Sequence, residues 1–114
     1  MWWNRKSSAE SGAVRAVDFR EAKRLIDTLP DCVLLDVREE EEYITGHAVD
    51  AQLLPVDTIT AETAAALIPT KATPVLVYCR SGMRSRRAAA LLAALGYGEI
   101  YDMGGLVGWP YGLE

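Results

Sequence analysis

Apolar positions along this chain occur in two patterns, and the two patterns alternate. Short continuous runs of apolar residues, such as 32–36 and 75–79, are rich in branched side chains and stop at charged or turn residues. Runs of this kind are typical of buried strands. Between these runs, apolar residues recur at helical spacing. The sequence therefore predicts strands at 14–17, 32–36, 51–54, 75–79 and 99–101.

Helix boundaries follow from capping residues and glycines. Asp18, with Glu21 three residues later, predicts a capping box at the start of a helix that ends near Pro30. A helix from Ser85 has Gly96 at the place of a C-terminal cap. Further helices are expected at 39–44, closed by Gly46, and at 60–68, with a turn or helix near 105–109.

Alternating strands and helices predict an α/β fold with a mainly parallel central sheet of about five strands and helices on both faces. Ligands of such sheets bind beyond the carboxyl ends of the strands. Asp36 and Cys79 end two predicted strands, so we expect them on one rim. The domain is expected at 13–112, after a flexible lead-in at 1–12. Trp2 and Trp3 in this lead-in are expected to pack on the domain or to be disordered, with partner binding as the alternative. Residues 113–114 are a candidate expression-vector remnant and receive no functional weight.

Composition narrows the class of protein. The 114 residues are 50% hydrophobic and 25% charged, which fits one small domain. The net charge of −4 argues against nucleic acid or an anionic membrane as the main partner. Two cysteines form no disulfide framework and suit a reducing compartment. The chain shows no signal peptide and no membrane-spanning run, so we expect a cytoplasmic protein.

Cys79 is the main candidate for chemistry, because it ends a strand and opens a loop that leads into a helix. Backbone N–H groups of a tight loop and a helix N-terminus both attract anions, and Gly82 allows the loop an unusual backbone conformation. The charges of Arg80 and Arg84 act in the same direction. Together these features favour the thiolate, the nucleophilic form of cysteine. The competing interpretation is a buried structural cysteine.

The segment Cys79-Arg-Ser-Gly-Met-Arg-Ser85 closely resembles the active-site loop of rhodanese-type sulfurtransferases. The resemblance includes 34–43 with Gly46-His47, and 104–109, and it extends over about 14 to 112. It implies a single-domain thiosulfate sulfurtransferase. Such an enzyme takes a sulfane sulfur from a small anionic donor and passes it, through a persulfide, to cyanide or to a thiol acceptor (a small molecule or a thioredoxin-like protein). No metal or organic cofactor is called for. At 48–51 the chain departs from the family, with Asp50 in place of a glycine.

The resemblance also implies roles for individual residues. Cys79 is the expected nucleophile. Asp36 is expected to cap the next helix or to pair with an arginine of the Cys79 loop, with proton transfer as the alternative. Arg38 is expected to hold the segment 39–42, an acidic run that otherwise solvates an exposed helix face. The expected substrate-binding residues are Arg80, Ser81, Gly82, Met83 and Arg84, and Asp36, Arg38 and Ser85 are the expected supporting residues.

His47 and Cys32 each have two interpretations. His47 is the only histidine and is either the base of a Cys–His hydrolase or, as the resemblance favours, a brace between a helix and a strand. One histidine and this cysteine spacing fit no metal site. Cys32 is either a small buried side chain, which we favour, or a redox-resolving thiol.

Loop length separates the competing activities. Four residues lie between Cys79 and Arg84, whereas the related phosphatases and arsenate reductases have five and thereby a wider cradle. The shorter loop accompanies sulfur transfer in the family. Two alternatives stay open: a phosphatase or arsenate reductase, and a sulfur-carrying or protein-binding module with little turnover.

Overall fold

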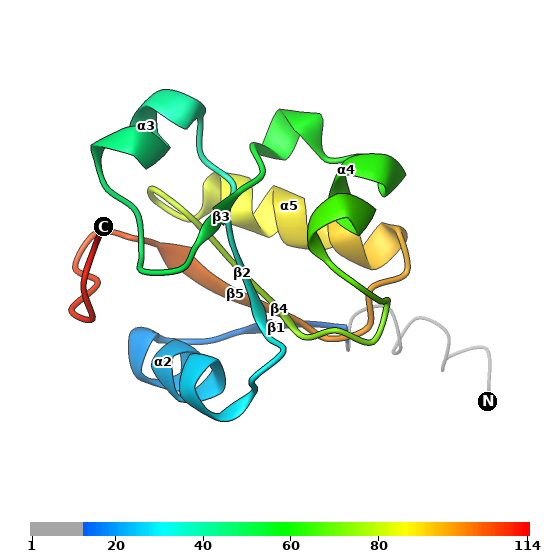
Figure 1. Cartoon of the computed structure of the whole chain (residues 1–114), viewed down its shortest axis with the longest axis horizontal. Coiled ribbons are helices and arrows are strands. Elements are labelled where there is room, and N and C mark those ends of the chain that lie inside the picture. Colours follow the sequence, from blue (N-terminus) through cyan, green and yellow to red (C-terminus); the bar gives the residue numbers. More distant parts are fainter. Residues whose placement is uncertain (1–12) are drawn as a thin grey trace.

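The computed structural model describes residues 13–114, and the lead-in with Trp2 and Trp3 lies outside them. Five strands form one sheet in the order β1-β5-β4-β2-β3, and every neighbouring pair is parallel. This arrangement confirms the predicted α/β class (Figure 1). The strands are β1 (Val14–Ala16), β2 (Val33–Asp36), β3 (Gln52–Leu53), β4 (Val75–Cys79) and β5 (Ile100–Gly105).

Helices cover both faces of the sheet, as predicted. Figure 1 shows one helix below the sheet and the others above it. Two buried clusters fill the two interfaces, one with residues of α4 and α5 and the other with residues of α2. The helices are α2 (Phe19–Thr28), α3 (Glu40–Thr45), α4 (Ala61–Leu67) and α5 (Met83–Ala94), with a short 3₁₀ turn, η1 (Val56–Thr58).

The central strand β4 divides its side chains between these clusters. Val77 and Cys79 belong to the cluster with α5, and Tyr78 belongs to the cluster with α2. This alternation is the period of two that a strand buried on both faces imposes. Cys79 is thus placed on the face from which α5 departs.

One predicted capping contact and one predicted helix start differ from the structure. Asp18 caps α2 by accepting from the Glu21 N–H at 2.8 Å, but the Glu21 carboxylate pairs with Arg24 instead of closing a capping box. The prediction that the last long helix begins at Ser85 is wrong, because α5 begins at Met83 after Gly82 with φ 106°. Gly82 has no side chain to act as a cap, so the sequence pattern did not mark this start.

The C-terminal part also differs from prediction. β5 continues to Gly105 rather than ending at Tyr101, because β4 offers it backbone partners as far as the Cys79–Gly105 pair. Of the turn or helix expected near 105–109, the structure has the turn, at residues 107–108. Leu113 pairs with Ala48 in an antiparallel bridge, and Glu114 exchanges two backbone hydrogen bonds with His47.

No helix within residues 13–114 is long and apolar enough to cross a membrane.

Candidate active site

Cys79 lies at the carboxyl end of β4 and is 1% exposed. The chain turns sharply after it, and the Gly82 N–H donates to Cys79 Sγ over 2.9 Å. Gly82 adopts φ 106°, a left-handed conformation that strains other residues. The sequence prediction that Gly82 shapes the loop is confirmed, because this conformation directs the N–H group at the sulfur.

The pKa of the Cys79 thiol is lowered from its ordinary value of 9.0. Burial acts against this by disfavouring the charged form. The N–H groups of Ser85, Gly82 and Ser81, together with the Ser85 hydroxyl, outweigh burial because they donate toward the sulfur. The loop and the first turn of α5 therefore form the predicted N–H nest and stabilise a thiolate.

Gly105 gives the Cys79 loop the space it occupies. A Cβ atom on Gly105 would lie 2.9 Å from Ser81 Cα and would overlap the Arg80 carbonyl oxygen. Next to it, the Leu106 N–H donates to the Cys79 carbonyl over 2.9 Å. The loop thus rests directly on the backbone of β5, which is possible only where β5 carries a glycine.

Arg84 does not face the sulfur as a free charge. Its guanidinium donates to both oxygens of Glu42, on α3, over 2.7 and 3.0 Å. The hydrogen bonds of Arg84 hold the pKa of Glu42 at about 2. The expectation that 39–42 only solvates a helix face is therefore wrong for Glu42, although Glu39, Glu40 and Glu41 are exposed.

Asp36 is fully buried and belongs to a network beneath the loop. It accepts from Arg38 Nη2 and from the Tyr78 hydroxyl, both over 2.6 Å. Asp36 neither caps α3 nor pairs with an arginine of the Cys79 loop, so both of those structural expectations are wrong. Arg38 lies only two residues from Asp36, and its backbone N–H and its Nε both donate to the Asp36 carboxylate. This carboxylate is therefore already paired within its own segment of the chain.

Arg38 and His47 both brace α3. Arg38 Nη2 donates to the Gly46 carbonyl over 2.8 Å, so it holds α3 by its C-terminal end rather than by the acidic segment. His47 Nδ1 lies 2.9 Å from the Tyr43 carbonyl oxygen, and the two rings stack at 3.7 Å. The bracing role that the resemblance implied for His47 fits these contacts.

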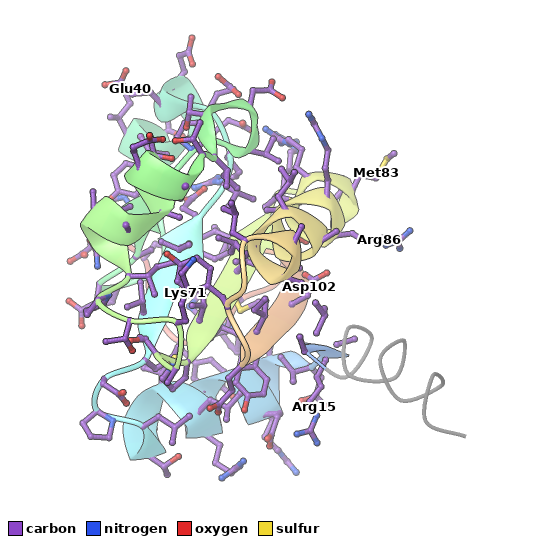
Figure 2. The ribbon with its side chains drawn as sticks, turned by 90° about the vertical axis from the view of Figure 1, so that its right-hand side faces the viewer. Arg15, Glu40, Lys71, Met83, Arg86 and Asp102 are labelled. Atoms are coloured by element: carbon purple, nitrogen blue, oxygen red, sulfur yellow. The ribbon has the colours of Figure 1, made fainter. Side chains whose placement is uncertain are left out.

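The remaining loop residues differ in exposure. Arg80 and Ser81 are exposed, and Ser85 is fully buried, with its hydroxyl oxygen 3.1 Å from the Gly82 carbonyl oxygen. Met83 is 78% exposed and begins α5. Figure 2 shows the Met83 and Arg86 side chains projecting away from the ribbon. Of the predicted loop arginines, Arg80 is therefore the one that stands open to solvent.

Cys32 differs chemically from Cys79. It is half-buried, and burial together with the charges of Asp31 and Glu99 raises its pKa to about 11. Its thiol therefore stays protonated near neutral pH, which agrees with the small packed side chain that we favoured.

Three residues of the site were missed by sequence reasoning: Glu42, Tyr78 and Gly105. Glu42 lies 42 positions before its partner Arg84, and Tyr78 was assigned only to a strand. Gly105 lay in the motif at 104–109 but was not linked to Cys79. A strand order that places β5 beside β4 would have revealed the Gly105 contact, but local periodicity does not supply it.

Comparison with known families gives a match over almost the whole described chain. Residues 12–110 match the family model described as Rhodanese-like domain. A protein named sulfurtransferase from Allochromatium vinosum is 39% identical over 89 residues, which cover 77% of this chain and 79% of the relative. Thiosulfate sulfurtransferase GlpE from Tolumonas auensis is 34% identical, with 83% and 87% covered.

Solved structures agree with this match. A structure described as a rhodanese with anions from E. coli has a TM-score of 0.67 and 30% identity, and covers 73% of this chain and 96% of that chain. The rhodanese-like domain of the Anabaena protein Alr3790 has a TM-score of 0.76 and 23% identity, with 87% and 77% covered. These neighbours share the parallel five-stranded fold.

Several relatives are much longer than this chain. The match spans 27% of the probable adenylyltransferase/sulfurtransferase MoeZ from Mycobacterium tuberculosis, at 31% identity. It spans 31% of a tRNA uridine(34) hydroxylase from Protochlamydia amoebophila, at 33% identity. The same domain thus occurs within proteins with different overall activities.

Proposed function

Because this chain belongs to the rhodanese-like domain family, we propose that it is a sulfurtransferase that moves a sulfane sulfur from thiosulfate to a thiol through a Cys79 persulfide. The observation that carries the proposal is the Gly82 N–H directed at Cys79 Sγ over 2.9 Å. Relatives named sulfurtransferase and thiosulfate sulfurtransferase support the same reaction class.

In the first step the Cys79 thiolate attacks the outer sulfur of thiosulfate. A new S–S bond forms, the bond between the two sulfurs of thiosulfate breaks, and sulfite leaves with the electron pair. The N–H nest around Cys79 then holds the anionic terminal sulfur of the persulfide. Arg80, the exposed loop arginine, attracts the anionic donor.

In the second step an acceptor attacks the terminal sulfur of the persulfide. Cyanide takes that sulfur as thiocyanate and returns Cys79 as a thiolate. A thiol acceptor, either a small molecule or a thioredoxin-like protein, leaves as its own persulfide. The enzyme alternates between the free Cys79 thiolate and the Cys79 persulfide. This mechanism therefore predicts ping-pong kinetics.

Intact-protein mass after incubation with thiosulfate tests the proposal. Wild type is expected to gain one sulfur atom that cyanide removes, and Cys79→Ser to gain none. Loading of Cys79→Ser, or absence of loading in pre-reduced wild type, would contradict the mechanism. Cys32→Ser is the matched control because it removes the other thiol and is expected to load normally.

A second candidate function is a sulfur carrier that serves one protein partner. Met83 and Val107, near the ends of β4 and β5, are 78% and 77% exposed, and exposed apolar side chains favour a protein contact. A carrier is expected to load sulfur yet discharge it slowly to small thiols. Steady-state turnover with cyanide and with a small thiol separates the enzyme from the carrier.

A phosphatase or arsenate reductase is the remaining alternative. Turnover of phosphoesters or arsenate without sulfur loading would favour it.

A further inference from the structure

A hollow of about 480 Å³ lies between α3 and η1, on the side of the sheet that α5 covers (Figure 1). More of its exposed wall is apolar than polar. Ile44, on α3, is 71% exposed and lines the hollow, and Pro55 lines it at the start of η1. An exposed isoleucine inside a hollow offers an apolar contact that a second molecule can cover.

Carboxylates surround this apolar wall. Among residues 13–114, no Lys or Arg lines the hollow. Asp57 lines it but is paired with Arg87 over 2.9 Å. The remaining acidic residues of the wall form no ion pair in the same part of the chain, and they are Glu39, Glu40 and Glu41. Three unpaired carboxylates beside an apolar surface complement a segment that carries Lys or Arg next to an apolar residue.

Two ion pairs connect the hollow to α5, the helix that follows the Cys79 loop. Glu42 of α3 holds Arg84 over 2.7 Å, and Asp57 of η1 holds Arg87 over 2.9 Å. Both walls of the hollow are thus fixed to the helix whose first turn stabilises the Cys79 thiolate.

The hollow and Cys79 also lie on the same face of the sheet. Val56, the first residue of η1, belongs to the same buried cluster as Cys79. The Glu42 hydrogen bonds raise the pKa of Arg84, and the charges of Cys79 and Glu39 act in the same direction. One guanidinium is therefore near both the wall of the hollow and the nucleophile. A protein interface of ordinary size, about 800 Å² per partner and roughly 30 Å across, covers both.

We propose that this hollow docks a basic segment of a protein that accepts sulfur from Cys79. Lys or Arg side chains of that segment pair with Glu40 and Glu41, and an apolar neighbour packs against Ile44. This inference rests on the proposed function, and it adds the kind of protein that the site serves. The same carboxylates repel a small anionic donor, so the hollow favours the acceptor over the donor.

The transfer to the docked acceptor balances without a further reactant. The acceptor thiol R–SH attacks the terminal sulfur of the Cys79 persulfide anion. An S–S bond forms to the acceptor, the S–S bond to Cys79 breaks, and Cys79 leaves with the electron pair. The thiol proton moves to the transferred sulfur, so the products are R–S–SH and the Cys79 thiolate.

The first measurement is binding of thiol-free peptides to the whole protein by fluorescence anisotropy at low ionic strength. One labelled peptide carries a leucine followed by three lysines, and its partner carries three glutamines instead. The lysine peptide is expected to bind about tenfold more tightly, and added salt is expected to remove this difference.

The second measurement is discharge of the Cys79 persulfide to the same two peptides, each now preceded by a cysteine and six glycines. Such a linker spans up to about 20 Å. Docking raises the local concentration of the acceptor thiol, so the lysine peptide is expected to discharge the persulfide about tenfold faster. Turnover with cyanide, which needs no docking, is the reference for every variant.

Two double variants with the same change in net charge form a matched pair. Glu40→Gln with Glu41→Gln is expected to remove the preference for the lysine peptide in both measurements. Asp31→Asn with Glu62→Gln is expected to retain it, because these two exposed residues do not line the hollow.

A second matched pair tests the apolar contact. Ile44→Ser is expected to weaken binding of the lysine peptide several-fold, because the leucine of the peptide loses its partner. Val49→Ser is expected to change it little, since Val49 is also exposed, at 44%, but does not line the hollow.

Equal affinity of the wild-type protein for the two peptides would overturn this inference while sulfur loading of Cys79 still stood. An equal loss in the two double variants would also overturn it, because net charge would then be responsible. Peptide binding without faster discharge would overturn the assignment to a sulfur acceptor. Self-association that Glu40→Gln with Glu41→Gln abolishes, without peptide binding, would assign the hollow to a second copy of the chain. Absence of sulfur loading from every donor would overturn the proposed function and the acceptor assignment together.

Discussion

The Glu42 carboxylate on α3 holds the Arg84 guanidinium of α5 through two hydrogen bonds of 2.7 and 3.0 Å. Glu42 Oε1 also accepts from the Glu39 N–H over 2.9 Å, so one side chain ties the start of α3 to the helix that follows the Cys79 loop. Charged two-point contacts of this kind fix geometry as well as adding free energy. Arg84 therefore stabilises the loop, and Arg80 is left as the loop arginine that is open to solvent.

Glu42→Gln is expected to lower the free energy of unfolding by about 1–2 kcal/mol at neutral pH, because it removes a partly buried charged pair. The pairing lowers the pKa of Glu42 from 4.5 to about 2. The difference between variant and wild type should therefore be complete above pH 4.5 and disappear as the pH falls toward 2. Urea unfolding at several pH values measures it.

Glu41→Gln is the control for this prediction, because Glu41 is exposed and forms no ion pair within residues 13–114. It should change stability little at any pH. An equal loss in both variants would show that net charge, and not the Glu42–Arg84 pair, is responsible.

The rate of sulfur loading should follow the thiolate form of Cys79. Since hydrogen bonds lower the pKa of this thiol from 9.0, the rate is expected to rise with pH and to reach half of its maximum below pH 9.0. Ser85→Ala removes a hydroxyl that favours the thiolate, so its midpoint should move upward. The measurement is loading rate against pH in a Cys32→Ser background.

Ser81→Ala is the matched control for Ser85→Ala. It also removes a hydroxyl, but Ser81 acts on the Cys79 pKa through its backbone N–H, which alanine retains. A midpoint that moved equally in both variants would contradict the assigned role of the Ser85 hydroxyl.

Gly105→Ala is expected to destabilise the fold by about 1–3 kcal/mol and to slow sulfur loading, because the added methyl group overpacks the space of the Cys79 loop. Thermal unfolding and loading kinetics check both effects. Gly98→Ala is the control, since its nearest neighbour would lie 4.0 Å from the new Cβ. Equal stability and equal loading rates of Gly105→Ala and Gly98→Ala would show that the contact between β5 and the Cys79 loop does not require a glycine.

Asp36→Asn is expected to cost about 3–5 kcal/mol, because it leaves the buried Arg38 guanidinium without its counter-charge. Asp57→Asn breaks an exposed pair with Arg87, and there a loss of less than about 1 kcal/mol is expected. Urea unfolding of both variants at neutral pH gives the comparison. A small loss in Asp36→Asn would mean that water or another group satisfies Arg38.

Local patterns predicted the strands and the Cys79 loop well, because both depend on short-range features. β4 has the predicted bounds, and Gly82 takes the predicted unusual conformation. The contacts that complete the site join residues far apart in the chain, such as Glu42 with Arg84. The local sequence pattern does not indicate such a pair, since each residue alone is typical of a charged residue on the protein surface.

The errors have a similar physical origin. Asp36 was expected to cap the next helix or to pair with an arginine of the Cys79 loop, but the neighbouring Arg38 and the buried Tyr78 hydroxyl donate to its oxygens instead. The start of α5 was misplaced because a glycine in a left-handed conformation leaves no side-chain cap in the sequence. The partners of Asp36 and the start of α5 were thus determined by side-chain contacts in the folded protein and by the backbone conformation of one glycine.

The parallel pairing of β2 and β4 keeps the two thiols at opposite ends of the sheet. Val33, which follows Cys32, pairs with Val75, whereas Cys79 ends the same strand β4. A displacement of about five residues along a strand amounts to roughly 16 Å, and a disulfide requires Cα atoms within about 7 Å. Cys32 therefore cannot act as a resolving thiol for Cys79 within one chain, and under the proposed function the acceptor that takes the sulfur from Cys79 must come from outside the chain.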